Sequence, residues 1–202
     1  RHGTPLQRVL AAAIIFISLF LGLLLLFTAG FGTLTGYLQR IVFVFAIVSL
    51  GLLVKSARGL PWHRRGLPGL VPDLVLIAAL FAGLLHVLGD YDEFARRVGF
   101  PLPQDLAYGI IYIVATLEVT RRFLGWPMLV IIAVFLTQAL FGEWFPSLFS
   151  APNVRWQTLV EILFMQDQGL FGPTTAVAAT YLMIFLVFGS MLVRTHAVDF
   201  FQ

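Results

Sequence analysis

The stretch VLAAAIIFISLFLGLLLLFTA, residues 9–29, decides the structural class of this chain. It contains 21 consecutive residues without a charge, and a helix needs roughly 20 residues to cross about 30 Å of hydrocarbon. A cleaved signal peptide is the alternative, because Arg1 and Arg8 precede the run. The apolar core of a signal peptide is usually only about 7–15 residues long. We therefore expect a retained membrane helix.

The composition of the whole chain agrees with this expectation. Of its 202 residues, 59% are hydrophobic and 11% are charged, which is more apolar surface than a soluble domain of this length buries. The formal charge of +3 comes from bases clustered at the ends of apolar runs. This placement favours an orientation signal in the bilayer over a nucleic-acid partner. The absence of cysteine excludes disulfides, thiolate metal sites and cysteine nucleophiles.

Six apolar runs predict an all-α integral membrane protein with about six transmembrane helices. The runs are residues 9–29, 41–54, 74–89, 106–119, 123–142 and 169–193. The shorter ones reach the required length through weakly polar flanking residues and side chains that extend to the interface. The run 41–54 spans only if its helix begins near Leu34 and Arg40 reaches back to the headgroups.

Residues 153–169, NVRWQTLVEILFMQDQG, predict an amphipathic helix rather than a span. Its apolar residues recur at helical spacing: Trp156, Leu159, Val160, Leu163 and Phe164. Its polar residues fall elsewhere: Arg155, Gln157, Glu161 and Gln166. We expect this helix to lie in the membrane interface, with packing on neighbouring helices outside the bilayer as the alternative. The following GLFGP predicts that the chain turns back at Gly172 and Pro173.

The Lys and Arg residues fall unevenly on the two sides of the predicted helices, nine of the 13 on one side and four on the other. The first group is Arg1, Arg8, Lys55, Arg58, Arg64, Arg65, Arg121, Arg122 and Arg194. The second is Arg40, Arg96, Arg97 and Arg155. The positive-inside rule therefore predicts a multi-pass protein with both termini in the cytoplasm.

The segment TLEVTRRFLGW, residues 116–126, places an acid and two bases between two apolar runs. Arg121 and Arg122 follow Glu118 at i+3 and i+4, close enough on a helix to pair with it. We interpret the segment as a cytoplasmic helix junction, with Trp126 in the aromatic belt and Pro127 opening the next helix. An ion or substrate site is the alternative, which the two adjacent positive charges disfavour for a cation.

No hydrolase, zinc-protease or P-loop signature occurs, so we expect no enzyme, no catalytic residue, no metal and no cofactor. The four histidines lack the spacing that puts two ligands on one helix face; they are His2, His63, His86 and His196. Only His86 lies in an apolar run. A contact with Asp90 is expected there, as an interfacial hydrogen bond or, alternatively, as a proton relay.

From about Asp90 onward, the chain resembles the fused permease of tripartite ATP-independent periplasmic (TRAP) transporters. The likeness is to the type that joins a four-helix small part to a large part and works with a TAXI-type binding protein. The matching stretches are DYDEFARRVGFPLPQDLAYGI, LEVTRRFLGWPMLVIIAVFLTQALFG and QGLFGPTTAVAATYLMIFLVFGSMLVRTHAVDFF. The resemblance implies a four-helix small (Q-like) domain over 1–122. It implies that 123–202 hold a junction helix, the amphipathic segment and the first helix of the large (M-like) domain.

The resemblance also implies a function. The chain is then expected to be part of a secondary transporter in the inner membrane of a bacterium or archaeon. Such a transporter imports organic acids and is driven by a sodium or proton gradient. The implied partners are a large M-like domain or subunit, a periplasmic TAXI-type binding protein and the bilayer. Family members often carry an acid where Gln168 and Val193 stand here. The substrate-binding hairpins of the family lie in the large part, beyond residue 202, so we expect a scaffold that does not transport alone. A small structural or assembly membrane protein is the alternative.

Overall fold

The computed structural model describes residues 5–31, 36–57, 67–145 and 151–195, and in these ranges all regular structure is helical. The helices are α1 (Pro5–Phe31), α2 (Gly36–Ala57), α3 (Leu67–Gly89), α4 (Tyr91–Arg96), α5 (Pro103–Leu124), α6 (Trp126–Leu140), α7 (Trp156–Phe164), α8 (Pro173–Val177) and α9 (Met183–Arg194). Two short turns complete them, the 3₁₀ turn η2 (Gly142–Trp144) and the π-helical turn η3 (Ala178–Leu182). Several residues of the sequence analysis lie outside the described ranges: Arg1, His2, Leu34, Arg58, His63, Arg64, Arg65 and His196.

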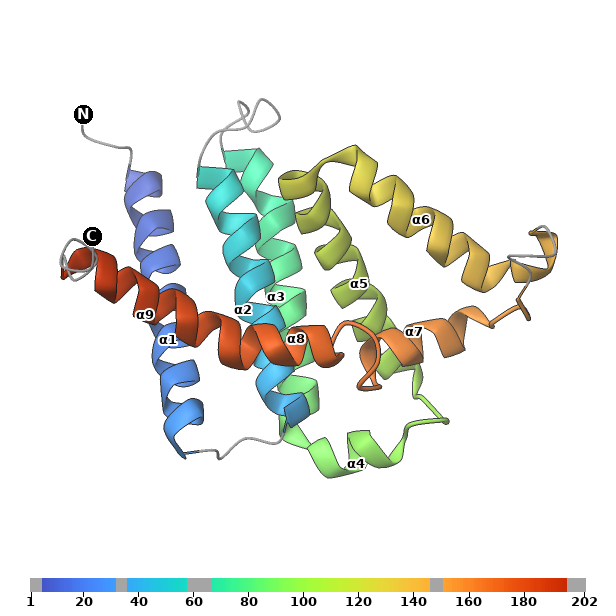
Figure 1. Ribbon diagram of the computed structural model, residues 1–202. Helices are drawn as coiled ribbons and strands as arrows, with labels where there is room; N and C mark the ends of the chain where they lie inside the picture. The colour runs from blue at the N-terminus through green and yellow to red at the C-terminus, as the bar shows by residue number, and fades with distance from the viewer. Residues whose placement is uncertain (1–4, 32–35, 58–66, 146–150, 196–202) are drawn as a thin grey trace.

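Helices α1, α2, α3 and α5 form a bundle in which each runs antiparallel to the previous one (Figure 1). The start of α3 and the end of α5 therefore lie at one end of the bundle, here called the Glu118 end. The end of α3 and the start of α5 lie at the other, here called the Asp105 end. The end of α5, which carries Arg121 and Arg122, lies at the same end of the bundle as the start of α1. The positive-inside rule had assigned these residues to one side of the membrane.

Within the described ranges, four helical segments are long and apolar enough to cross a membrane, by length and composition. They are Val9–Thr28, Gly36–Val54, Leu70–Gly89 and Pro173–Arg194. The helix expected from the run 41–54 begins at Gly36, close to the start that a span requires.

The two remaining runs differ from expectation. Helix α5 has 22 residues, but charged side chains occupy both of its ends, so its apolar part is short. Helix α6 has 15 residues, which corresponds to about 22 Å and is shorter than the predicted run 123–142. Gly125 ends α5 with φ of 83° and directly precedes α6, with proline in the first turn. Phe141 ends α6 ahead of the 3₁₀ turn.

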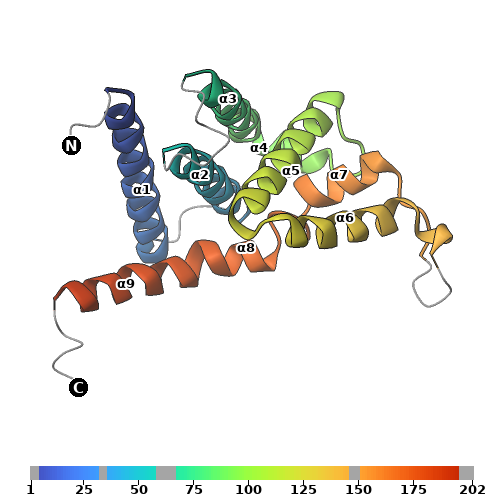
Figure 2. The same ribbon diagram turned by 90° about the horizontal axis from the view of Figure 1, so that it is seen from above.

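The last helices lie transverse to the bundle. Helices α8 and α9 cross α2 and α1 at a steep angle in both views (Figures 1 and 2). The run 169–193 begins with the turn predicted at Gly172 and Pro173, and its helical part starts at Pro173. It also contains the π-helical turn η3, which the sequence analysis did not predict. Gln39 Nε2 of α2 donates to the carbonyl oxygen of Ala179 in this turn at 3.2 Å and to Thr28 Oγ1 of α1 at 3.3 Å. The first bond attaches the turn to α2, and the second joins the same Gln39 side chain to α1.

The amphipathic helix expected over residues 153–169 is present as α7, and it packs on α5. Gly109 of α5 permits this contact, because a Cβ there would meet Val160 Cγ1 at 2.6 Å and Phe164 Cβ at 3.1 Å. Glu161 was assigned to the polar face, but it is only 6% exposed. Its burial has a local cause, because the carboxylate is held by hydrogen bonds described below.

The core is continuous across the expected domain boundary at 122/123. Five rings stack in tilted or edge-on contacts at centroid distances of 5.1 to 6.0 Å: Tyr37, Phe94, Tyr112, Phe164 and Phe171. The first three belong to the four-helix part and the last two to the segment after it. The link between α7 and α8 is therefore part of the bundle's packing.

Candidate functional site: ionic clusters at the two ends of the bundle

At the Glu118 end, one carboxylate accepts hydrogen bonds from two arginines on the same helix. Arg121 donates from Nη2 to Oε1 at 2.7 Å and from Nε to Oε2 at 2.8 Å. Arg122 donates from Nε to Oε1 at 2.7 Å. The contacts expected from the i+3 and i+4 spacing are therefore present, because both arginines lie one turn after Glu118.

Arg122 also joins α5 to α3. Its guanidinium holds Asp73 through two hydrogen bonds, Nη2 to Oδ1 at 2.6 Å and Nη1 to Oδ2 at 2.9 Å. The Asp73 side chain is 2% exposed and the Arg122 side chain 12%. Sequence reasoning missed Asp73, which is 49 positions away in the chain. A signal existed, because a lone carboxylate beside Pro72 in an apolar helix requires a basic partner from another element.

Trp126 lies at the same end and is 61% exposed. The Arg121 guanidinium carbon lies 5.7 Å from the centre of its ring, within the range of a cation–π contact. Beside it, α5 and α6 diverge around an apolar cleft of about 350 Å³ with Glu118 and Arg121 on its wall. The two carboxylates and two guanidiniums of this cluster balance in formal charge. The arrangement joins α3 to α5. It also means that the Glu118 carboxylate is paired with arginine guanidiniums rather than with a small inorganic cation such as sodium.

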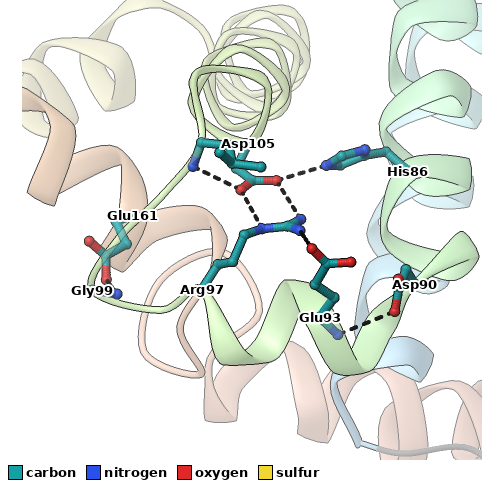
Figure 3. Close-up of polar contacts among 8 residues, drawn as sticks. His86, Asp90, Glu93, Arg97, Gly99, Asp105 and Glu161 are labelled. Atoms are coloured by element: carbon teal, nitrogen blue, oxygen red, sulfur yellow. Dashed lines mark hydrogen bonds and ion pairs between the residues drawn. The ribbon is translucent and has the colours of Figure 1, made fainter.

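At the Asp105 end, a second buried carboxylate gathers donors from three parts of the chain (Figure 3). Asp105 accepts from His86 Nε2 at 2.7 Å, from Arg97 Nε at 3.1 Å and Nη2 at 3.2 Å, and from the Leu102 backbone at 3.1 Å. Its side chain is completely buried. Asp105 thus connects α3, the end of α4 and the start of α5.

The expected partner of His86 was wrong. Asp90 accepts instead from the backbone N–H of Glu93 at 3.3 Å and caps α4. The chain bends between α3 and α4 at this residue, so the i+4 relation of a continuous helix does not apply. The ring of Tyr108 lies 5.1 Å from the His86 ring, centre to centre, and covers it on one side.

Glu161 of α7 extends the second cluster towards the loop that precedes α5. Its Oε1 accepts from the Gly99 backbone N–H at 2.7 Å and from Gln166 Nε2 at 3.2 Å. Figure 3 shows the Glu161 carboxylate directed at this loop from the side opposite Asp105. Arg97 also pairs with the exposed Glu93 at 3.3 Å.

Arg40 was expected to reach the headgroups, but it binds within the protein. Its Nη1 donates to Asp167 Oδ1 at 2.9 Å and to the Phe171 carbonyl oxygen at 2.7 Å. Next to this pair lies a cleft of about 470 Å³ lined mainly by Tyr37, Tyr91, Phe94, Met165, Gln166 and Asp167. Burial raises the pKa of Tyr91 above its usual value, and the negative charges of Asp167 and Asp92 raise it further.

These clusters join α3, α4, α5 and α7 to one another through paired charges and backbone hydrogen bonds. In the part of the chain that the structure describes, no three His, Asp or Glu side chains are placed to hold a metal ion. No family model, no curated protein and no solved structure matches the chain. The interpretation of the site therefore depends on its geometry and on the sequence resemblance.

Proposed function

We propose that the chain is a scaffold portion of a TRAP-type secondary transporter in the inner membrane of a bacterium or archaeon. The observation that carries this proposal is the pairing of the bundle's buried carboxylates with arginines at both ends. Asp73 is paired with Arg122, and Asp105 with Arg97. A transport site for a cation needs carboxylates or carbonyls that are available to the ion, whereas these carboxylates fix one helix to another.

The two ionic clusters are 13 positions apart along α3, from Asp73 to His86, and 17 apart along α5, from Asp105 to Arg122, which corresponds to about 20 and 25 Å of helix. The residues between them, 74–85 on α3 and 106–117 on α5, carry no charge. This distribution supports a bundle that stands across the bilayer, with paired charges near both interfaces and apolar side chains between. In the proposal the bundle helices α1, α2, α3 and α5 span together with α6, and the transverse segment from α8 to α9 turns towards the bundle axis to become the sixth span. Both termini and the Glu118 end face the cytoplasm.

The exposed apolar surface of α6 and α9 supports a larger assembly. Helix α6 has no fully buried side chain, and α9 exposes large apolar residues along its length. These are Phe185, Leu186, Phe188, Met191 and Val193. Lipid covers part of this surface in the proposal, and a large M-like domain or subunit covers the rest. The chain then holds the stationary part of the transporter in the bilayer.

The remaining parts of the proposal come from the resemblance. The complete transporter imports organic acids, a periplasmic TAXI-type protein delivers them, and a sodium or proton gradient drives the import. The outer loops at the Asp105 end, including α4 and residues 143–167, are the proposed contact region for the binding protein. The substrate and ion sites belong to the large partner.

Affinity purification tests this assembly. The tagged chain is extracted from its native membranes in a mild detergent, and the copurifying proteins are identified by mass spectrometry. We expect a large multi-span subunit with an M-like sequence, and a reading frame for a TAXI-type binding protein beside the chain's own. A large partner of unrelated sequence would support the structural or assembly role instead. Recovery of the chain alone from membranes that contain the M-like protein would contradict both roles.

A further inference from the structure

The loop between α4 and α5 presents an apolar tip at the Asp105 end. Residues 98–102 read VGFPL, and their large side chains point outward: Val98 is 40%, Phe100 87% and Leu102 43% exposed. An exposed phenylalanine of this degree is unusual on a surface that faces water only, particularly with two exposed apolar neighbours. The loop carries no charged residue between Arg97 and Asp105.

The tip is held in one conformation by the second ionic cluster. Gly99 donates its N–H to Glu161 at 2.7 Å, Leu102 donates its N–H to Asp105 at 3.1 Å, and Phe100 donates its N–H to the Arg97 carbonyl at 2.9 Å. Gly99 adopts φ of 96°, which a residue with a side chain rarely adopts. Two buried carboxylates from different helices thus fix the backbone that carries Phe100. A surface feature fixed in advance loses little entropy when it binds.

The position of residues 98–102 in the fold indicates which environment the loop contacts. The loop lies at the lateral edge of the bundle, at the level where α3 ends and α5 begins (Figures 1 and 2). From there, an apolar exposed stripe continues along α5 through Ala107, Ile110 and Val114 at helical spacing. The tip is thus the end of a surface that faces lipid if α5 stands in the bilayer.

We propose that the apolar loop, residues 98–102, is a membrane anchor that inserts Phe100 into the outer headgroup region of the bilayer. The inference depends on the proposed membrane function. Arg96 is exposed immediately before the loop and is positioned for lipid phosphates, which is the usual combination of a base and an aromatic residue at an interface. Asp92, exposed one turn before Arg96 on α4, marks the limit of the inserted surface.

The chain contains no cysteine, so a single introduced cysteine can carry a nitroxide label. Phe100→Cys, Asp92→Cys and Leu19→Cys are labelled separately in the full chain. Each is placed in nanodiscs of equimolar phosphatidylcholine and phosphatidylglycerol. Leu19 is 61% exposed in the middle of α1 and reports whether the bundle is in the bilayer at all. Electron paramagnetic resonance then compares collisions with oxygen, which concentrates in lipid, and with a water-soluble nickel chelate.

We expect the label at 100 to lose nickel accessibility relative to the label at 92 while oxygen accessibility rises, and the label at 19 to be deeper still. Nickel accessibility at 100 equal to that at 92 would overturn the anchor. Exclusion of both reagents at 100 would also overturn it, because it would indicate a protein contact. Nickel accessibility at 19 would instead contradict the proposed membrane function. The two failures are therefore distinguishable.

The role of the clamp is tested with the label at 100 in a Glu161→Leu background, which removes the acceptor of the Gly99 N–H. We expect a more mobile label and partial recovery of nickel accessibility, because the loop no longer has one fixed conformation. Glu143→Leu is the matched control, since Glu143 is exposed in η2 and belongs to neither ionic cluster. Equal spectra in the Glu161 and Glu143 variants would show that the clamp does not position the tip.

Discussion

Arg122 on α5 holds Asp73 on α3 with two parallel hydrogen bonds of 2.6 and 2.9 Å, and both side chains are largely buried. This pair joins α3 to α5 at the Glu118 end of the bundle. The two residues are 49 positions apart in the sequence. A bidentate guanidinium–carboxylate contact is both strong and geometrically specific. It sets the rotation and height of α5 relative to α3.

The first prediction concerns this pair. Arg122→Gln removes the charge that compensates Asp73, and we expect the free energy of unfolding in detergent micelles to fall by about 3 kcal/mol. Asp73→Asn should cost a similar amount. The double variant with Leu at 73 and Met at 122 should recover most of the stability, since it removes both buried charges. Additive losses when Arg122→Gln and Asp73→Asn are combined in a double-mutant cycle would contradict a direct pair.

Glu118→Ala is expected to loosen the junction between α5 and α6. The change removes the acceptor of three arginine hydrogen bonds, and the expected loss of stability is about 2 kcal/mol. Complex recovery with the large partner should fall before the ion dependence of transport changes. Glu143→Ala is the control, because Glu143 is exposed. An unchanged yield of complex with altered ion dependence would show that Glu118 belongs to an ion site.

Gly109→Ala is expected to displace α7 from α5. The new Cβ would lie 2.6 Å from Val160 Cγ1, and overpacking of this kind costs about 1–3 kcal/mol. The control is Gly22→Ala in α1, where a Cβ meets nothing within 4 Å. That change should stabilise the helix by about 0.5–1 kcal/mol. Thermal unfolding of both variants in the same detergent checks the opposite signs, and equal effects would contradict the packing of α7.

Asp105→Asn is expected to release the loop before α5. An amide keeps one acceptor oxygen, but it cannot accept from His86, Arg97 and Leu102 together with a full charge. Hydrogen exchange of the backbone amides of Gly99, Phe100 and Leu102 should therefore become several-fold faster, with α1 unaffected. Asp92→Asn should change neither region. Unchanged exchange in the Asp105 variant would show that other contacts hold the loop.

The sequence predicted those features of the fold that depend on local chemistry. The helix break before Pro127 and the turn at Gly172 and Pro173 follow from backbone restrictions that these residues impose wherever they occur. The contacts of Glu118 with the two arginines follow from spacing on one helix. The full extent of α5 was underestimated, because Asp105 and Arg122 appear to end an apolar run although they belong to the helix.

The features that sequence reasoning missed all depend on tertiary contacts. His86 was paired with its nearest acid in sequence, Asp90, because nothing local indicates that α4 bends away and brings Asp105 within 2.7 Å. The sequence around Asp73 does not point to Arg122, 49 positions away, as its partner. The π-helical turn η3 has no residue pattern of its own, and its stability depends in part on the amide of Gln39, 140 positions away.

The central claim is that this chain supports transport without performing it, and uptake into proteoliposomes tests that claim most directly. The purified chain is reconstituted alone and together with its M-like partner and binding protein. Radiolabelled succinate and glutamate are then offered under an inward sodium gradient and, separately, an inward proton gradient. The account predicts gradient-dependent uptake with the partners and none above empty liposomes with the chain alone. Uptake by residues 1–202 alone would contradict it.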